Sequence, residues 1–294
     1  MPTTPPPALT SSDGRPVSQL AARISTARSE GRSALISYLP VGYPTVEDSI
    51  AAMAATVSGG ADVVEIGVPY SDPGMDGPTI QKAVEVAVRA GVGMRDVLRA
   101  VEGVAKTGAV PVVMSYWNPI DRYGVARFAR DLGSAGGAGA ITPDLIPDEA
   151  AEWMAAADDA DLDRVFLVAP SSTDARLAMT AASCRGFLYA ASTMGVTGTR
   201  DAVSSAAPGL VARVRAVSDI PVAVGLGVSS GAQAAEVARY ADAVIVGAAF
   251  VRALLDADDP AAGAKAAHAL AAELAAGVRQ KLSPGSTPRP KSPI

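Results

Sequence analysis

The sequence predicts an α/β fold, a single (β/α)8 barrel of the TIM type with one additional helix before its first strand and a disordered tail at each end. Eight short runs rich in Val, Ile and Leu alternate with amphipathic segments, which is typical of parallel strands covered by crossover helices. Eight such units fit a closed barrel. An open doubly wound sheet is disfavoured, because no G-x-G-x-x-G motif follows the first run.

The predicted elements are short and regularly spaced. The strands are expected at residues 34–40, 62–69, 111–117, 139–145, 164–170, 186–192, 221–227 and 243–249. The helices between and after them are expected at residues 46–58, 79–89, 95–106, 126–135, 148–157, 174–182, 210–217 and 232–240. Two further helices, at residues 17–30 and 261–281, are expected to pack outside the barrel.

The chain of 294 residues can form one large domain. We expect the barrel to span residues 17–282. The segments 1–16 and 283–294 are rich in Pro, Ser and Thr, and we predict that both are disordered.

Composition and charge narrow the classes of function. Apolar residues make up 49% of the chain, charged residues 19%, and the formal net charge is −5. No block of Lys and Arg is present, so neither nucleic acid nor an anionic membrane is an expected ligand. The N-terminus lacks the pattern of a secretory signal, and no apolar stretch has the length of a membrane span. With Cys184 as the single cysteine, we expect a cytoplasmic protein.

A carboxylate inside an apolar run is the strongest sign of chemistry. Glu65 lies in the second half of the strand expected at 62–69, where an ionised carboxylate is costly unless its pKa shifts or it finds a partner. Asp76 follows in a long connection, and active sites of such barrels lie at the C-terminal strand ends and their loops. Two structural alternatives remain open. Glu65 could be satisfied by an Arg or by backbone donors, and Asp76 could serve as a turn residue or helix cap.

Two glycine clusters at the ends of neighbouring predicted strands indicate a phosphate site. Gly225 and Gly227 end the seventh run, and Gly247 lies in the eighth. Glycines there let backbone N–H groups approach an anion, and barrels often bind phosphate on these two loops. The alternative is that the glycines only permit tight turns or close packing. A third glycine-rich connection, residues 192–207, has the length of a lid or of a solvated linker.

No metal site is expected. His268, the single histidine, lies in the predicted terminal helix, far from any strand end. No cluster of Cys and His has the spacing of metal ligands. Acid and base chemistry near neutral pH would then fall to carboxylates or tyrosines.

Several short motifs carry a resemblance to a known family. The most specific is EIGVPYSDPGMDGPTIQ at residues 65–81. The others are YLPVGYP at 38–44, YWNP at 116–119, PD at 143–144, GFLY at 186–189, GVTG at 195–198 and GLG at 225–227. In order and spacing, from about residue 18 to residue 280, the sequence resembles the tryptophan synthase alpha chain.

The resemblance implies a retro-aldol cleavage of indole-3-glycerol phosphate into indole and glyceraldehyde 3-phosphate. It implies that Glu65 carries the protons, that Asp76 accepts the indole N–H, and that Tyr189 orients the catalytic Glu or the glycerol. Tyr38 and Tyr116 lie in two of the shared motifs, and the resemblance implies that both contact the substrate.

Phosphate binding is also implied by the resemblance. The family uses backbone donors at positions that match Gly198, Gly227, Gly247 and Ala248. A serine is usual at the last of these positions, so this chain keeps the N–H and lacks a hydroxyl contact worth about 1 kcal/mol.

The closing loop shows a second departure. Many family members carry a basic residue where this chain has Thr193. Thr197 matches the threonine that links this loop to the catalytic Asp, so loop closure is expected to align Asp76.

A partner is the last implication of the resemblance. The family works as an α2β2 complex in which indole passes to a beta chain that carries pyridoxal phosphate, so no cofactor is expected in this chain. Asp72, Asn118 and Pro119 are expected in loops that resemble the family's contact region. Two rival functions are a catalytically weak chain that mainly activates the beta chain, and another phosphate-binding barrel enzyme.

Overall fold

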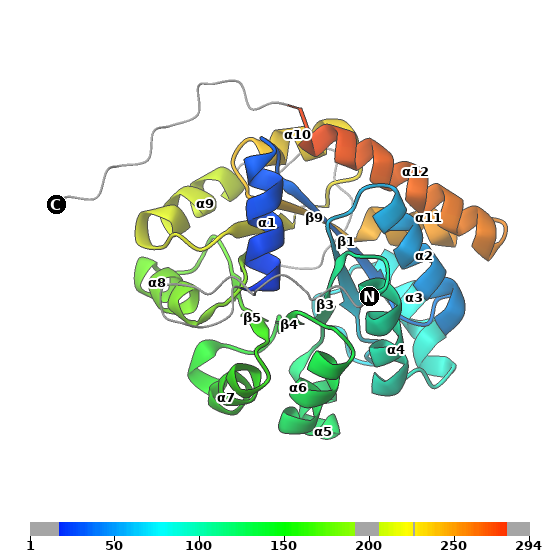
Figure 1. Ribbon diagram of the computed structural model, residues 1–294, viewed down its shortest axis with the longest axis horizontal. Helices are drawn as coiled ribbons and strands as arrows, with labels where there is room; N and C mark the ends of the chain where they lie inside the picture. Colours follow the sequence, from blue (N-terminus) through cyan, green and yellow to red (C-terminus); the bar gives the residue numbers. More distant parts are fainter. Residues whose placement is uncertain (1–17, 192–205, 226, 281–294) are drawn as a thin grey trace, which may run out of the picture.

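A closed barrel of parallel strands forms the centre of the molecule (Figure 1). The computed structural model describes residues 18–191, 206–225 and 227–280. The predicted tails and three predicted site residues, Thr193, Thr197 and Gly198, lie outside these described residues. The strands are β1 (Ala34–Pro40), β2 (Val63–Gly67), β3 (Val110–Met114), β4 (Gly139–Ile141), β5 (Asp163–Val165), β6 (Leu167–Val168), β7 (Leu188–Ala191), β8 (Val222–Gly225) and β9 (Ala243–Val246).

The described strands number nine because the fifth predicted strand is split at Phe166. The sheet runs in the order β5-β4-β3-β2-β1-β9-β8-β7-β6, so the two pieces of this strand lie at its two ends. The Phe166 carbonyl accepts from the Tyr189 N–H on β7 at 3.1 Å, and its own N–H donates to the Cys184 sulfur at 3.4 Å. The Val165 carbonyl accepts from the Thr142 N–H, next to β4, at 3.2 Å. The split strand therefore closes the predicted eight-fold barrel.

Helices surround the barrel and supply the outer layer of its core (Figure 1). In α4, for example, Val97, Val101 and Val104 recur every three or four residues and are fully buried, as an amphipathic helix requires. The helices are α1 (Gln19–Ser29), α2 (Val46–Ser58), α3 (Pro78–Arg89), α4 (Met94–Ala105), α5 (Trp117–Tyr123), α6 (Val125–Ser134), η1 (Pro147–Glu149), α7 (Ala151–Asp159), α8 (Asp174–Ser183), α9 (Ala206–Val217), α10 (Gly231–Ala238), α11 (Ala248–Leu255) and α12 (Pro260–Val278).

Two of these helices were not predicted, and both follow a strand almost directly. The strands expected at 111–117 and 243–249 end earlier, at Met114 and Val246, and the residues beyond them begin α5 and α11. A continuous apolar run does not distinguish a strand from a short helix that follows it. The expectation that Asn118 and Pro119 lie in a loop was therefore wrong, because both belong to the first turn of α5.

The inside of the barrel has its own core. Alternate residues of the strands, such as Ile36, Val63 and Ile245, point inward and form a cluster that also contains Leu20 and Ile24 of α1. Helix α1 therefore closes the N-terminal end of the barrel, and it lies in front of the strands in Figure 1. The predicted terminal helix, α12, instead packs on the outer layer beside α2 and α10.

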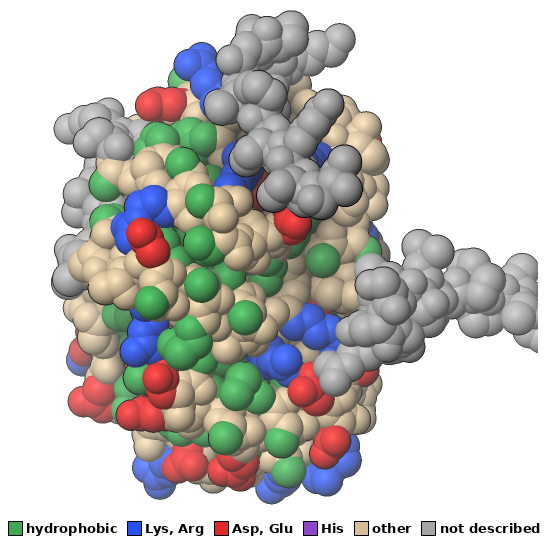
Figure 2. All heavy atoms as spheres, turned by 90° about the vertical axis from the view of Figure 1, so that its left-hand side faces the viewer, with side chains coloured by type: hydrophobic (Ala, Val, Ile, Leu, Met, Phe, Trp, Pro, Cys, Tyr) green, Lys and Arg blue, Asp and Glu red, His purple; other side chains and the backbone are tan. Residues whose placement is uncertain are grey.

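The surface carries both signs of charge. Figure 2 shows Lys and Arg interspersed with Asp and Glu over the face at the left of Figure 1. Ion pairs among the described residues include Arg164 with Asp158 and Arg213 with Asp174. Among the described residues, no helix has the length and apolar character needed to cross a membrane.

Candidate active site

Glu65 is a buried carboxyl group at the centre of the barrel. It is the third residue of β2, beside Tyr38 of β1 and Val112 of β3, and only 1% of its surface is exposed. Its Oε2 atom is buried and accepts no hydrogen bond from the described residues. Burial, and secondly the negative charge of Asp76, raise the pKa of Glu65 to about 8. At neutral pH Glu65 is therefore a protonated acid.

Asp76 lies in the connection between β2 and α3 and faces the same space. It is 9% exposed, and burial raises its pKa to about 6. Its charge also raises the pKa values of Glu65, Tyr38, Tyr116 and Tyr189, which places the five groups around one site. At neutral pH Asp76 is mainly ionised while Glu65 keeps its proton, so the site holds one acid and one carboxylate.

Two tyrosines flank Glu65, and glycines make room for their rings. A Cβ atom added to Gly67 would lie 2.6 Å from the Tyr38 hydroxyl, and one added to Gly247 would lie 3.0 Å from its ring. A Cβ atom added to Gly225 would lie 2.3 Å from the Tyr189 hydroxyl. Burial, with the charges of Glu65 and Asp76, raises the pKa of both tyrosines well above the usual value. Both hydroxyls therefore stay neutral and can donate hydrogen bonds.

The contacts with Tyr38 and Tyr189 bear on the two roles considered for the glycines, phosphate binding and close packing. Gly225 and Gly247 permit the close packing of these rings, and phosphate binding by Gly247 stays a prediction. Gly67 was missed as a site residue, although a glycine within a strand pattern is a known sign of close approach by another group.

The positions predicted to bind phosphate lie at the ends of two paired strands. Gly227 follows β8 with a φ of +68°, a conformation that favours glycine. Gly247 follows β9 and caps α11, and Ala248 is the first residue of that helix. The first N–H groups of a helix lack partners within the helix and are suited to bind an anion. Because β8 pairs with β9, the two loops meet at one edge of the barrel mouth.

Tyr116 reaches the connection that carries Asp76. Its hydroxyl accepts a hydrogen bond of 2.9 Å from the Met75 N–H, and its ring lies 5.3 Å from that of Tyr70. Asn118 donates to the Tyr70 hydroxyl at 3.4 Å. Asp72 and Asn118 are exposed, and Pro119 is half-buried. The three residues predicted to face a partner therefore lie around the connection that holds Asp76.

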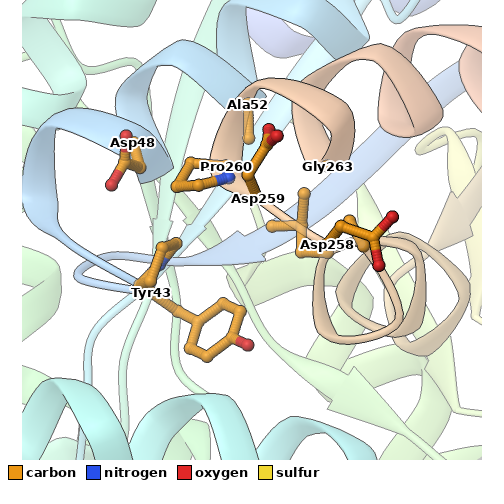
Figure 3. Close-up of a pocket in the computed structure, with 10 residues that line it drawn as sticks. Tyr43, Asp48, Ala52, Asp258, Asp259, Pro260 and Gly263 are labelled. Atoms are coloured by element: carbon orange, nitrogen blue, oxygen red, sulfur yellow. The ribbon is translucent and has the colours of Figure 1, made fainter.

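Other candidate sites lie elsewhere in the described part of the chain. No group of three or more His, Cys, Asp or Glu side chains there is arranged to hold a metal ion. His268 is exposed on α12, as its position in the sequence predicts. Figure 3 shows a surface hollow between Tyr43, Asp48 of α2 and the residues that precede α12. Neither Glu65 nor Asp76 lines this hollow, so it is separate from the barrel mouth.

Known proteins share this sequence and fold. The family description "Tryptophan synthase alpha chain" matches residues 24–279. The tryptophan synthase alpha chain of Mycobacterium marinum is 63% identical over 270 residues, which cover 92% of this chain and 98% of that protein. The Mycobacterium tuberculosis protein of the same name is 61% identical over 266 residues, covering 90% and 96%.

Solved structures agree with the sequence matches. A chain of Mycobacterium tuberculosis tryptophan synthase superposes with a TM-score of 0.85 at 60% identity, covering 90% of this chain and 99% of that one. Tryptophan synthase subunit alpha of Legionella pneumophila gives a TM-score of 0.76 at 30% identity, covering 90% and 98%. With near-complete coverage in both directions and a shared barrel, this chain belongs to the tryptophan synthase alpha chain family.

Proposed function

We propose that this chain cleaves indole-3-glycerol phosphate into indole and glyceraldehyde 3-phosphate, with Glu65 and Asp76 as the catalytic pair. The observation that carries the proposal is the buried carboxyl group of Glu65, whose Oε2 atom has no hydrogen-bond partner in the described structure, beside a second buried carboxyl group, Asp76; burial raises the pKa values of both, to about 8 and about 6. The reaction needs a proton donor and a fixed negative charge at the same time. Two carboxyl groups that titrate on opposite sides of neutral pH supply both.

Glu65 carries the protons. Its protonated carboxyl group delivers a proton to C3 of the indole ring, which leaves the ring cationic. The resulting carboxylate then accepts the proton of the hydroxyl on the adjacent carbon. As that O–H bond breaks, the carbonyl of the aldehyde forms, the bond between C3 and the side chain breaks, and its electron pair restores the aromatic ring. One side chain thus serves as acid and then as base and ends in its starting state.

Asp76 stabilises the cationic intermediate. Protonation at C3 moves positive charge toward the indole nitrogen, so a carboxylate that accepts its N–H binds the transition state more tightly than the substrate. Tyr189 donates from the opposite wall to the glycerol or to the ionised Glu65, and Tyr38 contacts the indole. Their neutral hydroxyls and their positions in front of glycines support these roles.

The phosphate group of the substrate binds where the loops after β8 and β9 meet, at the open end of the barrel. Gly227, Gly247 and Ala248 contribute backbone N–H groups, and the N-terminal end of α11 adds its dipole. Gly198 remains a prediction of the same kind, and Thr197 remains predicted to link the closing loop to Asp76; both residues, and Thr193, lie outside the described residues.

The partner is a tryptophan synthase beta chain, in an α2β2 complex. Family membership implies this partner, and the exposed residues Asp72 and Asn118, with Pro119, provide the contact surface around the Asp76 connection. The pyridoxal phosphate of the complete reaction belongs to that partner, and this chain binds no cofactor of its own.

The test is cleavage of indole-3-glycerol phosphate by the purified chain and by Glu65→Gln, which cannot donate or accept the proton. We expect the wild type to release indole and the variant to lose activity by at least about 10³-fold. The control is Glu85→Gln, which removes an exposed carboxylate on α3 and should leave the rate unchanged. Turnover by Glu65→Gln at the wild-type rate would refute the assignment of Glu65. An inactive wild type that still accelerates a beta chain would support the activator function instead.

A further inference from the structure

We propose that Tyr116 and Gln81 are positioning residues that clamp the backbone on the two sides of Asp76, Tyr116 at the Met75 N–H and Gln81 at the Asp76 carbonyl. This inference rests on the proposed function of Asp76 as the anchor of the indole nitrogen. It gives Tyr116 a role through the Asp76 connection, and it assigns a role to Gln81, the last residue of the motif at 65–81.

The first half of the clamp comes from the end of β3. The buried Tyr116, 8% exposed, accepts a hydrogen bond of 2.9 Å from the N–H of Met75, the residue directly before Asp76. Tyr116 is itself fixed, because the Ser115 hydroxyl donates to its carbonyl at 2.7 Å. The next N–H, that of Trp117, donates to Asp144 beyond β4 at 2.9 Å. The peptide before Asp76 is therefore tied to two strand ends of the barrel.

The second half comes from the first turn of α3. The side-chain amide of Gln81 donates to the carbonyl oxygen of Asp76 at 2.8 Å. The Gln81 backbone N–H donates to the Gly77 carbonyl at 2.9 Å, so the residue is held in the helix. Ile80 and Val84 of the same helix are buried in the outer core. The carbonyl of Asp76 is therefore tied to a helix that is packed on the barrel.

The hydrogen bonds made by Tyr116 and Gln81 lie on the two sides of Asp76, whose own N–H makes a long contact within the connection. The Asp76 N–H makes a long contact, 3.4 Å, to the Pro73 carbonyl, in a connection whose residues 69–77 include two prolines and two glycines. Its carboxylate must nevertheless meet the indole N–H with hydrogen-bond geometry in the transition state. A displacement on the order of 1 Å is enough to cost a large part of such an interaction. The hydrogen bonds from Tyr116 and Gln81, which lie outside the connection, hold the Asp76 backbone in the position that this geometry requires.

The variants that test the clamp are Tyr116→Phe and Gln81→Met. Each keeps most of the side-chain volume and removes one hydrogen bond, with the Met75 N–H for Tyr116→Phe and with the Asp76 carbonyl for Gln81→Met. In cleavage of indole-3-glycerol phosphate we expect kcat to fall about five- to tenfold in each variant and KM to stay within about twofold, because the anchor acts mainly on the transition state. The matched control is Tyr240→Phe, which removes a buried hydroxyl that has no hydrogen-bond partner in the described structure.

A second measurement does not depend on activity. Backbone amide exchange of residues 68–77 should be faster in both variants than in the wild type and unchanged in Tyr240→Phe. The proposal is overturned if kcat stays within twofold in both variants, if exchange is unchanged, or if kcat falls only together with a rise in KM and a lower melting temperature. An inactive wild type with faster exchange in the variants would refute the proposed function and leave the clamp itself supported.

Discussion

Two acidic residues only three positions apart on one strand meet opposite environments. Asp62, just before β2, is 6% exposed and accepts two hydrogen bonds from Arg32, at 2.6 and 2.8 Å, and one from the Leu35 N–H at 2.9 Å. Glu65, inside β2, is 1% exposed and its Oε2 atom has no partner in the described structure. The paired carboxylate lies at the closed N-terminal end of the barrel, and the unpaired one faces the open end. Burial alone therefore does not mark a candidate catalytic carboxylate, and Glu65 differs from Asp62 in that its buried Oε2 atom has no hydrogen-bond donor among the described residues.

The same contrast holds for the two ends of the barrel. At the closed end, Asp163 accepts from the Ser18 hydroxyl at 2.7 Å and from the Leu20 N–H at 3.2 Å, and so fixes the start of α1. Burial raises the pKa of Asp163 as it raises the pKa values of Glu65 and Asp76 at the open end, but Asp163 also faces Arg185, whose Nε lies 3.5 Å from its Oδ1. The carboxylates with cationic partners therefore lie at one end and the proposed catalytic pair at the other, as is usual for barrels of this class.

Of the predicted changes, breaking the ion pair between Arg32 and Asp62 should have the largest effect near neutral pH, and this effect should be on the free energy of unfolding. Arg32→Met leaves the buried Asp62 without its cation, which we expect to cost about 3–5 kcal/mol in the free energy of unfolding. Urea unfolding measures this cost, while kcat of the folded variant should stay near the wild-type value. Arg89→Met, which breaks an exposed pair with Glu85, is the control and should cost less than about 1 kcal/mol. Equal costs for the two variants would remove the distinction between buried and exposed pairs.

Removing the charge that faces the open end should affect catalysis instead. Asp76→Asn keeps the shape of the side chain and removes its negative charge, so we expect kcat to fall about 10²–10³-fold, as for other groups that stabilise developing charge. Steady-state cleavage kinetics measure it, with unfolding in urea as the check on folding. A kcat within threefold of the wild type would contradict the role of Asp76 as the anchor of the indole nitrogen.

Glu65 should lower stability as the pH rises. Its pKa is about 8 in the folded chain against 4.5 for an ordinary glutamate, so the folded state binds the proton more tightly. The resulting cost is absent below about pH 4.5, grows as the pH rises toward about 8, and is constant above it. Glu65→Gln, which never ionises, should therefore be more stable than the wild type by on the order of 5 kcal/mol at pH 9 and equal to it at pH 4. Unfolding in urea at the two pH values decides this, and a difference independent of pH would be inconsistent with an unpaired Glu65.

The smallest expected effect concerns the phosphate. Ala248→Ser adds a hydroxyl at the first residue of α11, where family members usually carry one. We expect KM to fall about fivefold, equivalent to about 1 kcal/mol. Ala249→Ser, one residue further along the helix, is the control. If both variants leave KM unchanged, the phosphate does not contact this end of α11 through a side-chain hydroxyl.

Much of this fold follows from the sequence for a physical reason. Strands buried on both faces must be continuous apolar runs, so the positions of β1, β2 and β8 could be predicted within a residue or two. Helices α5 and α11 could not, because their apolar residues continue the preceding strand without a separating turn. The break at Phe166 has no signal in the local sequence, since it depends on which neighbouring strand each half pairs with.

The site was predictable to a similar degree. Glu65 and Asp76 are visible as charges in and after a buried strand, and the structure brings both to the barrel mouth. The packing of Tyr38 against Gly67 and Gly247 was not predictable, because it depends on how a ring from one strand crosses its two neighbours. The bonds from Tyr116 and Gln81 to the Asp76 connection also join residues whose relation appears only in three dimensions.

The most direct measurement is the pH dependence of kcat/KM for cleavage of indole-3-glycerol phosphate, which reports the essential groups of the free enzyme. An ionised Asp76 and a protonated Glu65 require a bell-shaped profile, with apparent pKa values near 6 and 8 and a maximum near pH 7. The alkaline limb should disappear in any residual activity of Glu65→Gln. A wild-type profile that is flat between pH 5 and pH 9 would contradict the catalytic pair.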